Sequence, residues 1–167
     1  MKISQNFDIR EFVPKRVWDK FGLNSTWFVN EKAVKVAEFI KSFFTTYYKK
    51  KLGNDKVQTV LVVINNWHTG GTKQFCGLRL KECVEYKEFS QHSFMNAIDP
   101  ELYIKFTDGT IKEVDYVEIH KVIHEHESEF LANGITSIED VSIAVGWLHV
   151  DFRYIPVQSK LLVVKPA

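Results

Sequence analysis

Two histidines and one aspartate in the second half of the chain have the types and surroundings of metal ligands. His92 and Asp99 stand seven residues apart in residues 90–99, among small and polar residues that allow the chain to turn. His149 follows in residues 146–153, near the C-terminus. Catalytic zinc commonly takes three protein ligands and leaves the fourth position to water. Two imidazoles and one carboxylate meet that need, although they are compatible with other divalent ions as well.

Polar and apolar residues alternate in residues 146–153, which predicts a strand. His149 and Asp151 then project to one face, and the apolar side chains project to the other. Asp151 is therefore expected to act either as the acceptor of a proton from bound water or as a carboxylate that orients His149. Three further residues remain open as the proton acceptor: Glu139, Asp140 and His68.

Periodicity and turn signals predict the helices and strands that hold these residues in place. Residues 30–52 carry apolar side chains at helical spacing, and Gly53 stands where a C-cap would. Residues 57–64 are rich in valine and isoleucine, which is typical of a buried strand.

The second half of the chain predicts further strands and another helix. Residues 102–114 predict a hairpin around Asp108-Gly109, residues 115–132 a helix, and residues 141–154 a strand. Helices and strands do not alternate strictly in this order. The sequence therefore favours an α+β fold, with two main helices and a small, mainly antiparallel sheet, over a doubly wound fold.

Composition narrows the class of protein. A length of 167 residues predicts one domain over residues 1–167, and 45% hydrophobic residues exclude a disordered chain. A net charge of +1 argues against a dedicated nucleic-acid binder. Cys76 and Cys83 form no disulfide framework. Residues 1–8 lack the continuous apolar stretch of an export signal, and the longest apolar run, residues 60–64, is too short to span a membrane. We therefore expect synthesis in the cytoplasm without an export signal, and no membrane partner.

Two signatures frame the predicted ligands: Ser90-x-His92-x4-Ala97-x-Asp99 and Trp147-x-His149-x-Asp151. Together they resemble the paired signatures of the zinc D-Ala-D-Ala carboxypeptidases, a group that includes phage endolysins and the hedgehog zinc domain. The resemblance spans about residues 12–153. It implies a hedgehog-like or D-Ala-D-Ala peptidase-like fold in which His92, Asp99 and His149 hold one Zn²⁺.

The segment from residue 64 to Arg79 looks like the substrate-binding loop of phage-encoded members of that group. In the group an arginine of this loop holds a peptide carboxylate or stabilises negative charge. The resemblance therefore implies a catalytic role for Arg79, whose guanidinium can donate two parallel hydrogen bonds to an anionic oxygen. The expected substrate contacts are Trp67, His68 and Ser90.

The chain departs from the group at three positions. Met95 stands where a glycine is usual, and Asn65-Asn66-Trp67 replaces the usual Ser-Gly-Tyr-Arg strand end. Gly146 occupies the position, three residues before the last ligand, where many members carry an acidic or histidine base.

The resemblance implies a zinc metallopeptidase that hydrolyses peptide bonds in the stem peptides of peptidoglycan, either like a phage endolysin or like a carboxypeptidase. We expect a monomer, encoded by a phage or prophage and released at lysis or carried on the virion. Gly146 keeps open a catalytically inactive zinc-binding domain of the same fold, used in a virion or for interaction. A third hypothesis for the function is an α+β interaction domain that binds no metal.

Overall fold

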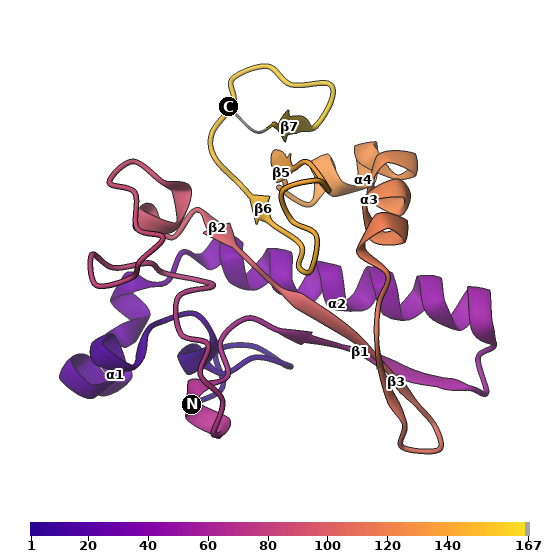
Figure 1. Cartoon of the computed structure of the whole chain (residues 1–167), viewed down its shortest axis with the longest axis horizontal. Coiled ribbons are helices and arrows are strands. Elements are labelled where there is room, and N and C mark those ends of the chain that lie inside the picture. Colours follow the sequence, from indigo (N-terminus) through magenta and orange to yellow (C-terminus); the bar gives the residue numbers. More distant parts are fainter. Residues whose placement is uncertain (166–167) are drawn as a thin grey trace.

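The computed structural model describes residues 1–165 and confirms a mixed α+β architecture (Figure 1). Its α-helices are α1 (Lys15–Phe21), α2 (Glu31–Leu52), α3 (Tyr116–Glu125) and α4 (Glu127–Ala132). Its strands are β1 (Val57–Val63), β2 (Ala97–Ile98), β3 (Glu101–Phe106), β4 (Ile111–Glu113), β5 (Ser137–Glu139), β6 (Val150–Asp151) and β7 (Leu162–Val164). Short 3-10 turns complete the fold: η1 (Ile9–Glu11), η2 (Gly22–Phe28), η3 (Trp67–Thr69) and η4 (Gln91–Phe94).

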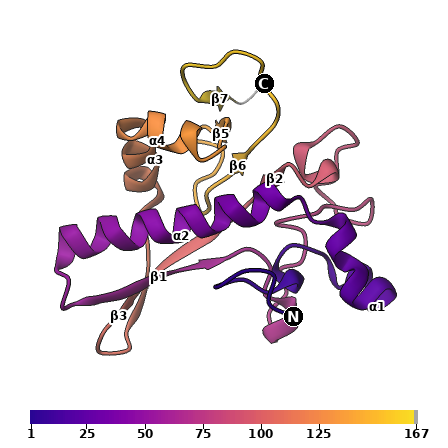
Figure 2. The same cartoon turned by 180° about the vertical axis from the view of Figure 1, so that it is seen from behind.

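The long helix α2 forms where its periodicity predicted. Asn30 caps its N-terminus by accepting a hydrogen bond from the backbone N–H of Lys32, and Gly53 ends it at a φ of 116° that an L side chain rarely adopts. One face of the helix is apolar and buried, and α2 runs along the sheet of β1 and β3 (Figures 1 and 2). Burial of this face against the sheet stabilises the helix, because helical propensity alone is a weak contribution.

The strands form two sheets, not the one that the sequence predicted. The first has the order β1-β3-β4 and is antiparallel, with the predicted hairpin turning at Asp108-Gly109. The second has the order β2-β6-β5-β7, antiparallel except for the parallel pair of β5 and β7. It lies beyond α2, beside α3 and α4 (Figures 1 and 2).

The chain passes from one sheet to the other at Asp99-Pro100, between β2 and β3. Proline has no N–H to donate to a ladder, which favours the end of strand pairing at this point. The carbonyl of Pro100 accepts a hydrogen bond from Leu148. Asp99 is thereby held where the two sheets meet, close to the start of β6.

Two predicted elements differ in the structure. The helix predicted over residues 115–132 is broken at His126, whose φ of −115° and ψ of 24° are not helical, and it forms α3 and α4. The strand predicted over residues 141–154 is wrong for most of its length, since only Val150–Asp151 pairs as a strand. The Asp140 side chain accepts hydrogen bonds from the backbone and hydroxyl of Ser142, and such local bonds compete with a ladder.

Within residues 1–165, no helix has both the length and the apolar character that crossing a membrane requires.

Candidate metal centre

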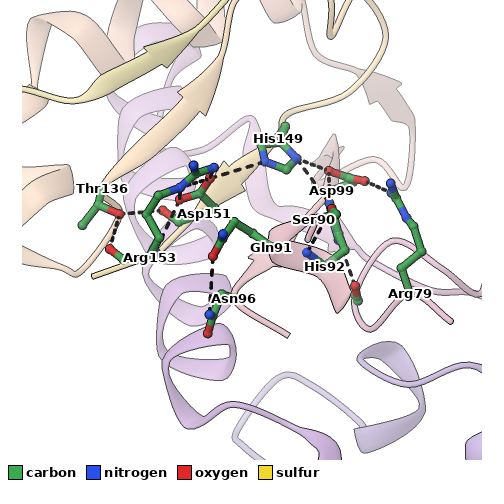
Figure 3. Close-up of polar contacts among 11 residues, drawn as sticks. Arg79, Ser90, Gln91, His92, Asn96, Asp99, Thr136, His149, Asp151 and Arg153 are labelled. Atoms are coloured by element: carbon green, nitrogen blue, oxygen red, sulfur yellow. Dashed lines mark hydrogen bonds and ion pairs between the residues drawn. The ribbon is translucent and has the colours of Figure 1, made fainter. Parts of the chain in front are cut away.

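His92, Asp99 and His149 converge on one point, as their sequence pattern predicted. Nε2 of His92 lies 3.2 Å from Oδ1 of Asp99 and 3.3 Å from Nδ1 of His149. Nδ1 of His149 lies 2.7 Å from the same Oδ1 (Figure 3). Three ligand atoms of three residues thus form a tight triangle, and both histidines are buried.

The chemistry and spacing of these atoms fit a divalent metal ion. With bonds of about 2.0–2.2 Å in a tetrahedron, ligand atoms lie roughly 3.3 Å apart, close to the separations seen here. Imidazole and carboxylate together suit zinc, although they also suit other first-row metals. The triad could therefore hold a metal ion, with a position left open toward solvent.

A short turn holds His92 in place. The Ser90 hydroxyl oxygen caps η4 by accepting a hydrogen bond from the backbone N–H of His92, 3.3 Å away. Nδ1 of His92 lies 2.9 Å from the carbonyl oxygen of Gly77, which can only accept, so Nδ1 carries the hydrogen. In the tautomer that carries its hydrogen on Nδ1, the ring presents the lone pair of Nε2 to the metal position.

Met95 ends this turn in the left-handed conformation, with a φ of 55°. It is the only non-glycine residue with positive φ in the described part of the chain, and its side chain is buried in the core. The turn therefore keeps a conformation that suits glycine, and burial of the Met95 side chain offsets its strain.

Position 77 has room only for a glycine. A Cβ atom on Gly77 would come 2.5 Å from the carbonyl oxygen of Phe12, which accepts a hydrogen bond from Leu78. The close contact places the Gly77 carbonyl against His92. The sequence did not single out this interaction, because a main-chain acceptor leaves no signature beyond the glycine itself.

His149 sits between two carboxylates (Figure 3). Its Nδ1 faces Asp99, whereas its Nε2 lies 3.9 Å from Oδ2 of Asp151 on the opposite side of the ring. Asp151 is fully buried, and Nε of Arg153 donates to both of its oxygens at 2.8 and 2.9 Å. Asp151 is thus placed to orient His149, and the ring separates it from the metal position. Arg153, two residues along the chain from Asp151, was not singled out by the sequence.

The two carboxylates and the buried imidazole perturb one another. Burial lowers the pKa of His149, but hydrogen bonds with Asp151 and Asp99 outweigh burial and raise it to about 10. Burial raises the pKa of Asp99, yet the charges and hydrogen bonds of His92 and His149 hold it below the ordinary range. Without a metal ion, His149 is therefore protonated near neutral pH.

Arg79 reaches this site but is already engaged. Its Nη2 donates to Oδ2 of Asp99 at 2.8 Å, and its Nε donates to the carbonyl of Phe75 at 3.3 Å. A guanidinium bound to a ligand carboxylate fixes the orientation of that ligand. The structure thus gives Arg79 a positioning contact that the sequence did not predict.

A cavity of about 390 Å³ opens beside the triad. Besides His92, Asp99 and His149, its lining carries three cations, two carboxylates, and aromatic and aliphatic side chains. The lining residues include Arg79, Glu85, Lys87, Phe89, Ser90, Glu139, Trp147 and Arg153. Phe89 is 80% exposed and Trp147 is 39% exposed, so apolar surface stands open next to the metal position.

Two expected substrate contacts lie elsewhere. The indole N–H of Trp67 donates to the carbonyl of Val13 at 3.0 Å, and His68 lines a separate hollow with Glu11 and Tyr103. Neither residue lines the cavity beside the triad. Ser90, the third expected substrate contact, does line the cavity. Contact of Trp67 or His68 with a substrate stays a prediction, and it would have to be made outside this cavity.

No family model, no curated protein and no solved structure matches this chain.

Proposed function

We propose that the chain is a zinc-dependent hydrolase that cleaves a peptide bond in the stem peptides of peptidoglycan. The observation that carries the proposal is the convergence of Nε2 of His92, Oδ1 of Asp99 and Nδ1 of His149 beside an open cavity. The resemblance of the two sequence signatures to the zinc D-Ala-D-Ala carboxypeptidases supplies the substrate class.

A bound zinc ion would polarise the scissile carbonyl and lower the pKa of a coordinated water to about 7. His92 and His149 would each present a lone pair, because Gly77 and Asp151 face their other ring nitrogens. Asp99 would bind through Oδ1, while Arg79 holds Oδ2. The protein thus orients all three ligand atoms in advance, and preorganisation of this kind is a principal source of catalytic power.

The cavity favours a polar peptide that carries both signs of charge. Its cations, Lys87 and Arg153 among them, would attract carboxylates, and its carboxylates, Glu85 and Glu139, would attract amino groups. Stem peptides carry both kinds of group, together with small apolar side chains. Trp147 offers an apolar contact at the edge of the cavity.

Metal analysis and a cleavage assay test the proposal together. The purified protein should contain about one zinc ion per chain and should release free amines from peptidoglycan. His92→Ala should lose both properties. His124→Ala, which removes an exposed histidine from α3, should keep both. Absence of stoichiometric zinc from the wild-type protein would reject the site itself.

Gly146 favours a second candidate, a zinc domain without catalysis that serves in a virion or in binding. Its position is open, since a Cβ atom there would meet nothing within 4 Å, and glycine offers no group to accept a proton. One zinc ion per chain without any cleavage of peptidoglycan would support this candidate over the hydrolase.

A further inference from the structure

The second sheet places Glu139 opposite His149. The register of β2 with β6 pairs Ile98 with Val150, so the next residues, Asp99 and His149, come opposite each other. Their contact of 2.7 Å agrees with this register. On the other side of β6, Ile138 pairs with the same Val150, which brings Glu139 opposite His149 in turn.

Asp99 directly follows β2, His149 directly precedes β6, and Glu139 is the last residue of β5. The three therefore form one row at the ends of neighbouring strands, with the histidine in the middle. Opposite residues of antiparallel strands project to the same face, with Cβ atoms about 5 Å apart. All three side chains line the same cavity, as does Val164, the partner of Glu139 on β7. The row forms one wall of the cavity, with a ligand carboxylate at one end and a second carboxylate across the histidine.

Glu139 is the carboxylate in this cavity that is not committed elsewhere. No hydrogen bond or ion pair within residues 1–165 engages it, and it is half-buried. Asp151 lies behind His149 and is held by Arg153, and Glu85 is exposed and accepts a hydrogen bond from Cys83 at 2.9 Å. Asp140, the next residue along the chain, is bonded to Ser142 outside the cavity.

We propose that Glu139 is the proton acceptor of this site. The inference rests on the proposed function. In the step, the oxygen of a water molecule bonds to the scissile carbonyl carbon while Glu139 takes one of the protons of that water. When the C–N bond breaks, the leaving nitrogen takes this proton from Glu139 and departs as an amine, so that atoms and charge balance. Glu139 of β5 would thus accept the proton that Gly146, which has no side chain, cannot accept.

Anion binding to the cobalt-loaded protein tests the position of Glu139 without any use of turnover. Azide, followed through the visible absorption of cobalt, should bind Glu139→Gln more tightly than the wild type by on the order of fivefold, because a negative charge near the metal position is removed. Asp140→Asn removes the same charge one residue away and keeps an oxygen that can accept from Ser142, so its azide affinity should match the wild type. An unchanged azide affinity in Glu139→Gln would overturn the proposal.

Metal content and hydrolysis complete the test. Glu139→Gln should keep one zinc ion and lose peptide hydrolysis by about 10²- to 10⁴-fold, whereas Glu139→Asp should keep the azide affinity of the wild type and recover part of the rate. Loss of metal from Glu139→Gln, or hydrolysis at the wild-type rate, would each count against the role. If the zinc-loaded wild type cleaves no peptide, the proposed function fails. The azide titration then still tests, independently of hydrolysis, whether the charge of Glu139 lies near the metal position.

Discussion

Arg79 and Asp99 form an ion pair on the side of the carboxylate that faces away from both histidines. Nη2 of Arg79 lies 2.8 Å from Oδ2, which leaves Oδ1 to His92 and His149. The two side chains are only 17% and 12% exposed, so solvent screens the pair less than it screens a surface ion pair. Oδ2 of Asp99 thus binds Arg79, and Oδ1 of the same carboxylate faces the metal position.

Replacement of Arg79 should therefore weaken metal binding. We expect Arg79→Met to lower zinc affinity by about 10- to 100-fold, because Asp99 loses the contact that fixes its orientation. Competition with a coloured chelator measures the change. Unaltered zinc affinity combined with a lower kcat would show instead that Arg79 acts on the substrate, as the sequence resemblance implied.

Zinc uptake should release protons. Because the pKa of His149 is raised to about 10, its ring is charged at pH 7 in the metal-free protein, and it must lose that proton to bind a metal ion. We expect His149 to release about one proton per zinc ion at pH 7, in addition to about half a proton from a bound water whose pKa falls to about 7, and an affinity that rises with pH up to the pKa of His149. Calorimetry in buffers of different ionisation enthalpy counts the protons. Release of no more than about half a proton would show that His149 is already neutral.

Gly77 and Gly146 offer a matched pair of substitutions. Gly77→Ala places a Cβ atom 2.5 Å from the Phe12 carbonyl oxygen, so we expect a loss of about 1–3 kcal/mol in the free energy of unfolding and weaker zinc binding through His92. Gly146→Ala meets nothing within 4 Å and should change stability by less than about 0.5 kcal/mol. Urea unfolding measures both variants. Equal effects would contradict the steric argument.

The left-handed conformation of Met95 predicts an unusual order of stability. Both Met95→Ala and Met95→Gly lose a buried side chain, which costs about 2–5 kcal/mol. At a φ of 55°, however, the glycine variant should be the more stable of the two by about 1 kcal/mol.

Lys35, an exposed residue of α2, provides the control for Met95. There the alanine variant should be the more stable by about 1 kcal/mol, because glycine is disfavoured within a helix. Denaturant unfolding of the four variants gives both orders. The same order at Lys35 and Met95 would contradict a left-handed Met95.

Two elements could not be predicted correctly from periodicity alone: the strand expected over residues 141–154 and the helix expected over residues 115–132. Polar and apolar side chains alternate in residues 141–154, which indicates a strand. The turn that Asp140 forms with Ser142 nevertheless keeps most of that segment irregular. His126 interrupts a helix whose apolar spacing continues past it. In residues 141–154 a local hydrogen bond thus outweighs the alternating pattern.

Local patterns in the sequence were enough to predict the α+β class, the helix α2, the strand β1, the hairpin of β3 and β4, and the three residues that converge as candidate metal ligands. These features depend on periodicity, on turn residues and on side-chain chemistry, all of which are local. The tertiary structure alone decided that Arg79 binds Asp99, that Trp67 turns toward Val13, and that Glu139 stands across from His149. The place of Glu139 depends on the register between strands far apart in the chain. The contacts of Arg79 and Trp67 depend on how their loops pack against distant segments, which no local pattern encodes.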